Sequence, residues 1–334
     1  MAIDVEKEIY QLCIVIINYR TPQLTIDCLY SLLPQVKNLS SSYVVIVDNN
    51  SLDNSVNLME EAISLNNWQP WISIIRSKIN GGFSYGNNLG IKAIKANNYL
   101  LLNSDTILRD NAIEILLKAL EKYPQGGIFS PRLEWLDETP QISCFRDRSP
   151  INELINAAQT SIVTKILSKY DIPLPVSEDV IEVQWTSFAC VLIRAEVIEK
   201  IGLMDEDYFM YFDDIDYCRR TREAGWKIIH YPFARVVHLR GGSGSMKKDL
   251  ATRKRPPAYL YASRSRYFAK FYGIFGLWLA NLLWLIGRSI SLTREIIEKK
   301  SPQTCDSEAK DIWLNCYNPL KSYNLKENYH EKKA

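Results

Sequence analysis

The sequence has almost no surplus of charge of either sign, and it is poor in histidine. Its 334 residues include 40 Lys and Arg, 38 Asp and Glu and three His, which gives a net charge of +2 at pH 7. This balance gives no support for a nucleic-acid partner, since such partners favour a basic chain. With 47% hydrophobic and 23% charged residues, the composition excludes disorder, collagen-like repeats and coiled coil as the main architecture. The length predicts one large domain or two ordinary ones.

Several common motifs are also missing. The seven cysteines include no CxxC pair, and no His joins them at zinc-finger spacing, so we expect a reducing compartment rather than disulfides or structural zinc. The first residues are acidic and lack a basic region, so we do not expect a signal peptide. No GxGxxG follows the first apolar run and no GxxxxGK[ST] occurs, which disfavours dinucleotide and P-loop sites.

What the sequence does contain is a regular alternation of apolar runs and helical patterns. Continuous β-branched runs predict strands that are buried on both faces, and alternation with helices predicts an open parallel sheet. The predicted strands are 12–17, 43–47, 71–75 and 99–102, and the predicted helices are 21–33, 53–67, 86–97 and 112–123. The second half is less regular, with strand-like pieces in 131–149, an amphipathic or variable segment at 151–170, strands at 181–185, 190–193, 227–231 and 234–238, and helices at 194–201 and up to about 225.

Polar loops follow three of the first four strands directly, at residues 18–20, 48–51 and 103–105. In open parallel sheets, ligands bind beyond the carboxyl ends of the strands, so we expect a ligand site there, although polar turns after strands are common in any case. Residues 80–90 hold four of the 14 glycines and are also rich in Asn. Such a loop permits close approach of a ligand, and its alternative role is a flexible turn that caps a helix.

Two residues that end apolar strands are candidate metal ligands. Asp105 ends the polar stretch after the fourth strand, and His238 closes the run 234–238. Carboxylate and imidazole suit Mn²⁺ or Mg²⁺ when substrate phosphates supply further oxygens. A hydrogen-bonded surface histidine is the alternative.

Three carboxylates, Asp213, Asp214 and Asp216, stand among aromatic residues. Apolar surroundings raise the pKa of a carboxyl, as a general base requires. Acidic residues at a helix start also favour the helix dipole, so capping and catalysis both remain open.

Taken in order, these motifs resemble an inverting glycosyltransferase of family 2 with a GT-A fold, and they are most similar to its rhamnosyltransferase-like branch. The resemblance covers about residues 10–275. It rests on the motifs at 14–19, 47–53, 80–88, 101–105 and 208–216. It implies a Rossmann-like, mostly parallel sheet flanked by helices.

The resemblance also implies roles for individual residues. Asp214 would be the general base, supported by Asp213, and Asp105 with His238 would hold Mn²⁺ or Mg²⁺. Trp185 and Asp216 would contact the acceptor. The residues that would bind the nucleotide sugar are Asn18, Asp48, Asn49, Ser51, Asn80, Gly82, Phe83, Asn87, Asn103 and Asp105. The first acidic position of the family's DxD motif is Asn103 here, which makes Asp105 the expected carboxylate ligand.

The implied reaction is direct displacement with inversion, from a dTDP- or UDP-sugar, with dTDP-rhamnose suggested by the branch, to a glycan or a polyprenol-linked acceptor in cell-surface polysaccharide synthesis. Two alternatives stay open: a nucleotidyltransferase, and a non-catalytic sugar- or lipid-binding scaffold on the same fold. The first would need a basic loop after the first strand, which residues 18–22 match poorly. The second is kept open by Asn103.

The chain is sharply basic before a long apolar run. Residues 246–270 hold eight Lys or Arg and one Asp, a net charge of +7, and residues 271–287 carry no charge. We expect this segment to associate with the membrane surface, with a true span or a buried helix as alternatives. The basic run predicts a catalytic domain on the cytoplasmic side, peripheral at the inner face of the membrane.

We therefore predict a catalytic domain over 1–245, with a nucleotide-sugar half at about 10–130 and an acceptor half at 131–245. A membrane-associating segment over 246–300 and a polar, loosely ordered tail over 301–334 would follow it.

Overall fold

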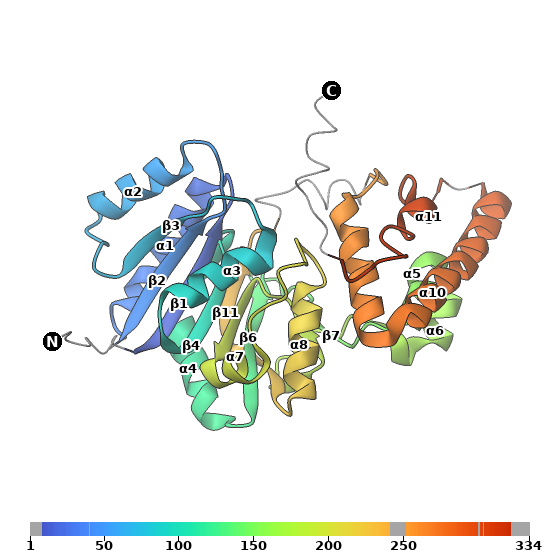
Figure 1. Cartoon of the computed structure of the whole chain (residues 1–334). Helices are drawn as coiled ribbons and strands as arrows, with labels where there is room; N and C mark the ends of the chain where they lie inside the picture. Colours follow the sequence, from blue (N-terminus) through green and yellow to red (C-terminus); the bar gives the residue numbers. More distant parts are fainter. Residues whose placement is uncertain (1–8, 40, 241–251, 300, 303, 322–334) are drawn as a thin grey trace. The chain divides into compact units, whose positions relative to one another are not determined.

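The computed structural model describes residues 9–39, 41–240, 252–299, 301–302 and 304–321 (Figure 1). The strands are β1 (Tyr10–Asn18), β2 (Ser42–Asp48), β3 (Ile72–Arg76), β4 (Ala96–Asn103), β5 (Thr106–Leu108), β6 (Gly126–Glu134), β7 (Cys144–Phe145), β8 (Ile181–Val183), β9 (Trp185–Thr186), β10 (Cys190–Arg194) and β11 (Lys227–His238). The helices are α1 (Pro22–Val36), α2 (Ser55–Leu65), α3 (Gly82–Ala93), α4 (Ala112–Lys122), α5 (Pro150–Ala158), α6 (Ser161–Ile166), η1 (Ser168–Tyr170), α7 (Ala195–Ile201), α8 (Asp213–Glu223), α10 (Ala258–Glu298) and α11 (Glu308–Asp311).

The strands of the described residues form one mixed sheet in the order β3-β2-β1-β4-β10-β6-β11-β5, with β8 beside β11, and a two-stranded sheet of β7 and β9. The β3-β2-β1-β4 half is parallel, as predicted. Beyond it, β10 runs antiparallel between β4 and β6, while β6 and β11 pair in parallel. The prediction of a mostly parallel α/β sheet is confirmed.

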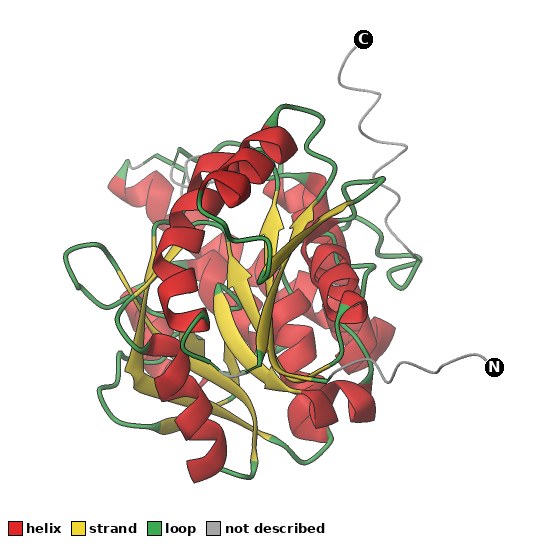
Figure 2. Cartoon of the chain, turned by 90° about the vertical axis from the view of Figure 1, so that its left-hand side faces the viewer, coloured by secondary structure: helices red, strands yellow, loops and turns green. Residues whose placement is uncertain are grey.

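Alternate residues of β1 enter two different cores, one on each face of the sheet. Ile14 and Ile16 belong to the core with α1, α2 and α4, while Cys13 and Val15 belong to the other core with α3 and α7. Because both faces are covered by helices, the strand carries no exposed polar face, which explains its continuous apolar run. Figure 2 shows helices on both faces of the strands.

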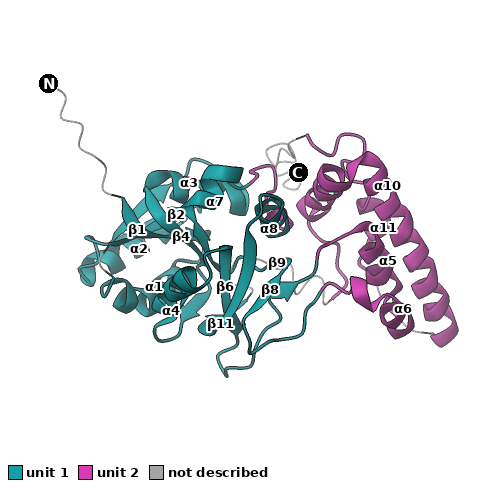
Figure 3. Cartoon of the chain, turned by 90° about the horizontal axis from the view of Figure 1, so that it is seen from below, with its two compact units in different colours: residues 1–146, 173–204, 214–244 teal, residues 147–172, 205–213, 245–334 magenta. Residues whose placement is uncertain are grey.

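The chain divides into two compact units, coloured in Figure 3. Unit 1 is Met1–Arg146, Pro173–Met204 and Asp214–Gly244, and unit 2 is Asp147–Ile172, Asp205–Asp213 and Ser245–Ala334. This division differs from the predicted linear one, because two internal segments join the C-terminal part.

Four local predictions were wrong. The glycine-rich stretch is the first part of α3 rather than a loop, since the helix begins at Gly82. The strand β6 begins at Gly126, earlier than predicted, because two glycines hid its start. The stretch 227–238 is one strand with two register shifts rather than two strands. The predicted tail contains α11, and Ile312 after it is fully buried within unit 2.

Two glycines of α3 are required by packing rather than by a ligand. A Cβ at Gly90 would lie 2.3 Å from Val15 Cγ1, and one at Gly86 would lie 3.0 Å from Ile17 Cδ1. These contacts bring the helix backbone close to β1 and account for two of the four glycines in the motif.

Candidate active site

The three predicted polar loops meet at one edge of the sheet in unit 1. In the strand register Asn18 at the end of β1 lies opposite Asp48 at the end of β2, and Ile17 lies opposite Asn103 at the end of β4. The carboxyl ends of parallel strands therefore bring the loops together as the sequence predicted.

Asn18 is the hub of a buried network that joins two of these loops. Its Nδ2 donates to Asp48 Oδ1 at 2.8 Å and to Ser51 Oγ at 3.2 Å, while its Oδ1 accepts from Thr25 Oγ1 at 3.1 Å. Ser51 Oγ also donates to Asp48 Oδ1 at 2.6 Å. All four side chains are at most 5% exposed, so this network fixes the loop after β2. The predicted contacts of Asn18, Asp48 and Ser51 with a nucleotide stay predictions.

A second set of hydrogen bonds ties the loop after β2 to the start of α3. Asn49 Nδ2 donates to Asn80 Oδ1 and to the Gly82 carbonyl, both at 3.0 Å. Gly82 has φ +84°, a conformation that favours glycine. Phe83 is half-buried, and Asn87 is buried and donates to the Phe83 carbonyl at 3.1 Å.

The two predicted metal ligands lie side by side although they are far apart in sequence. His238 Nε2 is 3.4 Å from Asp105 Oδ1, and their side chains are 14% and 10% exposed. Two ligand atoms at about 2.1 Å from one Mg²⁺-sized ion, at right angles, would be about 3.0 Å apart. The pair therefore fits adjacent positions on a single ion, and the remaining positions would need waters or phosphate oxygens, since no cluster of three or more His, Cys, Asp or Glu suited to a metal occurs among the described residues.

Backbone contacts hold both predicted ligands in place. Leu239 N donates to the Asp105 carbonyl at 2.9 Å, and His238 pairs with Thr106 of β5 in the register. Gln141 Nε2 donates to the His238 carbonyl at 2.7 Å, and Gln141 accepts from Arg240 Nε. Asn103 is half-buried, and its carbonyl accepts from Thr106 Oγ1 at 2.7 Å.

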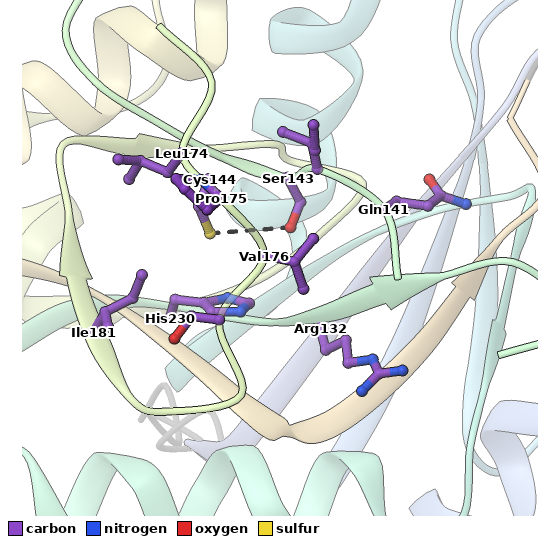
Figure 4. A pocket seen from close by; sticks show the side chains of 11 residues that line it. Arg132, Gln141, Ser143, Cys144, Leu174, Pro175, Val176, Ile181 and His230 are labelled. Carbon is purple, nitrogen blue, oxygen red and sulfur yellow. Dashed lines mark hydrogen bonds between the residues drawn. The ribbon is translucent and has the colours of Figure 1, made fainter. Parts of the chain in front are cut away.

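Gln141 also lines a small pocket of unit 1 between β6, β11 and residues 174–177 (Figure 4). His230 lies on this pocket, where burial lowers its pKa to about 4, and its Nδ1 is 3.2 Å from Ser130 Oγ. Ser143 and Cys144 contact each other on the opposite wall. The residues predicted for catalysis and metal binding do not line it, so the pocket is separate from the candidate site.

Asp214 is the second residue of α8 and is partly buried. Burial raises the pKa of its carboxyl to about 7, although the hydrogen bond from Ile215 N at 2.8 Å acts in the opposite direction. A carboxyl with this pKa can accept a proton near neutral pH, which is the property predicted for a general base. Asp213, the first residue of the helix, is 6% exposed.

The backbone just before these carboxylates is strained. Tyr211 and Phe212 have φ values of +69° and +66°, in the left-handed region that bulky residues rarely adopt. Each such residue costs about 1–3 kcal/mol and persists only where its surroundings hold it.

The two predicted acceptor residues have structural partners. Asp216 is 1% exposed and accepts from Arg220 Nε at 2.7 Å, while Arg220 also donates to the carbonyls of Ile201 and Leu203. Trp185 is half-buried, stacks on Phe145 at 4.0 Å and donates to the Arg146 carbonyl at 2.7 Å. Contact of either residue with an acceptor stays a prediction.

Comparison with known proteins assigns the chain to a family. Residues 11–273, most of the chain, match the family described as "Glycosyltransferase like family 2". The chain belongs to this family. The resemblance read from the five motifs is confirmed, and the match favours a glycosyltransferase over a nucleotidyltransferase.

Several curated members are similar at low identity. An N-acetylglucosaminyl-diphospho-decaprenol L-rhamnosyltransferase of Mycobacterium tuberculosis is 26% identical over 208 residues, which are 60% of this chain and 64% of that protein. The low-salt glycan biosynthesis hexosyltransferase Agl10 of Haloferax volcanii is 28% identical over 68% of this chain and 66% of its own length. Rhamnosyltransferase WbbL of Escherichia coli is 25% identical over 47% of this chain and 60% of its own length. The chain thus spans less than two thirds of the length of the mycobacterial relative.

Solved structures show the same fold at 13% identity. The mannosyltransferase PcManGT of Pyrobaculum calidifontis, in complex with GDP-Man and Mn²⁺, superposes with a TM-score of 0.55 over 96% of this chain and 85% of that one. GalNAc-T7 with UDP, GalNAc and Mn²⁺ superposes with a TM-score of 0.58 over 95% of this chain and 59% of that one. The predicted GT-A fold is confirmed.

Sequence reasoning did not indicate some residues of the candidate site. Gln141 supports His238 through a backbone carbonyl, and Thr21 Oγ1 lies 3.3 Å from Ser104 Oγ and links the loops after β1 and β4. Neither residue stands in a motif, so the sequence held no signal for them. The sequence shows the strained pair before Asp213 only as two aromatic residues, because a left-handed backbone leaves no trace in composition.

Proposed function

We propose that the protein transfers a sugar from a nucleotide-sugar donor to an acceptor hydroxyl with inversion at the anomeric carbon. The observation that carries this proposal is the pairing of Asp105 with His238 at the carboxyl edge of a GT-A sheet. Asp214, with its raised pKa, supplies the proton acceptor that a displacement of this kind needs.

In the proposed step, Asp214 removes the proton from the acceptor hydroxyl as its oxygen attacks C1 of the donor sugar. The new C–O bond forms on the face opposite the leaving group, and the bond from C1 to the diphosphate oxygen breaks. The bonding electrons leave with the nucleoside diphosphate, and the proton remains on Asp214. Asp105 and His238 would hold Mn²⁺ or Mg²⁺, whose chemistry is Lewis-acid neutralisation of charge on the diphosphate.

The donor-side residues are proposed to be Asn49, Asn80, Gly82, Phe83, Asn87 and Asn103 with the Asn18–Asp48–Ser51 network as their support. The names of the mycobacterial and E. coli relatives support rhamnose as the transferred sugar, and dTDP is proposed as its nucleotide on the branch resemblance alone. The mycobacterial name also supports a sugar on a polyprenol diphosphate as the acceptor class. Synthesis of a surface polysaccharide is proposed on the family resemblance. UDP-sugars are the alternative donors.

Donor binding provides the first test of this proposal. A ligand at 100 times its Kd stabilises the folded state by about 2.7 kcal/mol, so dTDP-rhamnose with Mn²⁺ should raise the melting temperature. UDP-glucose and GDP-mannose serve as matched controls and should shift it little. A larger shift with a control nucleotide would overturn the donor, and no shift with any of them would favour the non-catalytic scaffold.

The second half of α10 supports a membrane-surface location. Among the described residues, α10 is long and apolar enough to cross a membrane by length and composition. Three of its charged side chains are bonded within unit 2: Arg288 pairs with Glu295 at 2.6 Å, and Arg294 donates to the Gln159 carbonyl at 2.6 Å. Leu277 and Trp284 are buried, but many of its other large apolar side chains are exposed, and a large exposed apolar surface marks a site of membrane or protein contact. This apolar stripe consists of Phe275, Trp278, Leu279, Leu282, Leu285, Ile286, Ile290, Ile296 and Ile297.

The stripe spans about 33 Å at 1.5 Å per residue, and the opposite face of the helix packs on α5. A Cβ at Gly287 would lie 2.5 Å from the Leu154 carbonyl oxygen, so the two helices are in close contact. A helix with a packed partner on one face and an apolar stripe on the other is suited to lie in the interface rather than to span alone. We therefore propose a protein that is peripheral at the cytoplasmic face of the membrane.

The basic segment supports this location less than its charge suggested. Arg255, Arg264, Arg266 and Lys270 form ion pairs with acidic residues inside unit 2, while Lys247 and Lys248 lie outside the described residues. Paired charges attract anionic lipid weakly, so the apolar stripe is the main proposed contact.

Flotation with phosphatidylglycerol-containing vesicles tests the stripe. Phe275 and Leu282 are 81% and 53% exposed. Burial of each side chain in a bilayer should contribute about 1.5–3 kcal/mol to the free energy of binding. We expect F275S/L282S to weaken vesicle binding by about 100-fold or more. The matched control L58S/L65S changes two exposed apolar residues of α2 and should bind like the unaltered chain. Equal binding by both variants would contradict a membrane role for the stripe.

A further inference from the structure

The segment that leads into the proposed catalytic base is part of unit 2. Residues 205–213 group with the C-terminal unit, and Asp213 is also the first residue of α8, whose second residue is Asp214. We infer that the first half of α10 positions Asp214 by gripping this segment, an inference that rests on the proposed function. The grip, called here the clasp, consists of Tyr259, Ser263, Arg266, Tyr267 and Lys270 of α10.

One end of the clasp is ionic. Arg266 Nη2 is 3.0 Å from Asp205 Oδ2 and 2.7 Å from Asp207 Oδ2, and Lys270 Nζ is 2.8 Å from Asp205 Oδ2. The side chains of Asp205 and Arg266 are only 15% and 12% exposed. Partly desolvated, multiply bonded pairs hold their geometry better than exposed ones, so this end anchors the start of the segment to α10.

The other end of the clasp is aromatic and lies directly before the carboxylates. Tyr211 stacks on Tyr259 with ring centroids 6.2 Å apart and an interplanar angle of 17°. Phe212 packs on Tyr267 with ring centroids 5.6 Å apart, and the Arg148 guanidinium lies 4.9 Å from the centre of the Phe212 ring. These contacts hold the two residues with left-handed backbone.

Between the two ends, the backbone itself is bonded to the helix. Ser263 Oγ donates to the Met210 carbonyl at 3.1 Å, and Phe209 packs on the ring of Tyr259 at 5.1 Å. The segment is thus held by charge, hydrogen bond and ring packing from successive turns of one helix.

The strained backbone at Tyr211 and Phe212 explains why the clasp should matter for catalysis. A left-handed backbone at two aromatic residues persists only while neighbours enforce it. When the clasp is weakened, Tyr211 and Phe212 can relax, and the start of α8 with Asp214 changes its direction. The donor-side network of Asn18 and Asp48 is held by its own contacts within unit 1. Loss of the clasp should therefore impair turnover more than donor binding.

The test uses Tyr259→Ala in the full chain, with dTDP-rhamnose and a synthetic N-acetylglucosaminyl-diphospho-prenol as substrates. Tyr259 is half-exposed, so the variant should fold. Because a displacement of about 1 Å can cost about 100-fold, we expect kcat to fall about 100-fold with the donor KM unchanged within about twofold. The acid limb of the pH–kcat profile should also move, since the surroundings of Asp214 change. Tyr259→Phe keeps the ring and should restore kcat.

Two variants that each remove one ion pair test the ionic end of the clasp. Lys270→Gln removes a contact with Asp205, whereas Arg288→Gln removes the Arg288–Glu295 pair further along α10, where the arginine is similarly buried. We expect Lys270→Gln to lower kcat and Arg288→Gln to leave it unchanged. If Tyr259→Ala and Lys270→Gln keep normal kcat and pH profiles while Asp214→Asn is inactive, the clasp is wrong and the proposed function stands. If Asp214→Asn is itself fully active, the proposed function fails.

Discussion

Asp214→Asn is expected to lower turnover by about 10²–10⁴-fold, the usual contribution of a positioned general base. The amide keeps the size of the side chain and its place at the start of α8 but cannot accept the proton of the acceptor. Donor affinity should remain, because the proposed donor residues stand on the loops after β1, β2 and β4 and around the start of α3. The measurement is kcat with dTDP-rhamnose and the prenol-linked acceptor, with donor binding by calorimetry. Full turnover by this variant would favour the scaffold alternative.

The same carboxyl should set the pH dependence of the enzyme. Burial raises the pKa of Asp214 to about 7, and only the deprotonated form is a base, so kcat should fall as the pH drops below about 7. The folded chain also binds this proton more tightly than the unfolded chain. Its contribution to stability is present below the ordinary Asp pKa of about 4 and is lost as the pH rises through about 7. In Asp214→Asn the acid limb of kcat and this part of the stability profile should both disappear.

Asp105→Asn and His238→Ala should each abolish metal-dependent donor binding. Loss of a residue that merely supports a ligand typically costs about 10–100-fold in metal affinity, so loss of a direct ligand should cost more. Titration of Mn²⁺ in the presence of dTDP-rhamnose, followed by electron paramagnetic resonance, measures the effect. Asp27→Asn, a change at an exposed carboxylate of α1, should bind as the unaltered chain does. Unchanged Mn²⁺ binding by both site variants would contradict the assigned pair.

The sequence predicted that Asp105 and His238 lie together, because Asp105 closely follows one apolar strand and His238 ends another. Asp105 and His238 are 133 positions apart, yet the rule that ligands gather at the carboxyl ends of strands placed them on one edge, and the structure brings them to 3.4 Å. The same rule predicted that the loops at Asn18 and Asp48 lie at this edge of the sheet. Local patterns sufficed here because each strand is a continuous apolar run with a polar residue at its end.

Other features depend on contacts that local patterns do not contain. A charge count over 246–270 could not reveal that Glu153, Asp205 and Asp311 neutralise arginines and a lysine of this segment inside unit 2. The discontinuous units follow from the same contacts. The first residues of β6 were missed because Gly126 and Gly127 have no side chain to show burial, although a Cβ at Gly127 would lie 2.7 Å from Val197.

The anomeric configuration of the product tests the central claim most directly. The unaltered chain is incubated with dTDP-β-L-rhamnose, Mn²⁺ and the N-acetylglucosaminyl-diphospho-prenol, and the product is analysed by nuclear magnetic resonance. Displacement by one attack on C1, with Asp214 as the base, predicts an α-linked rhamnose and one dTDP released for each sugar transferred. A β-linked product, or a folded chain that binds the donor and transfers no sugar, would contradict the account.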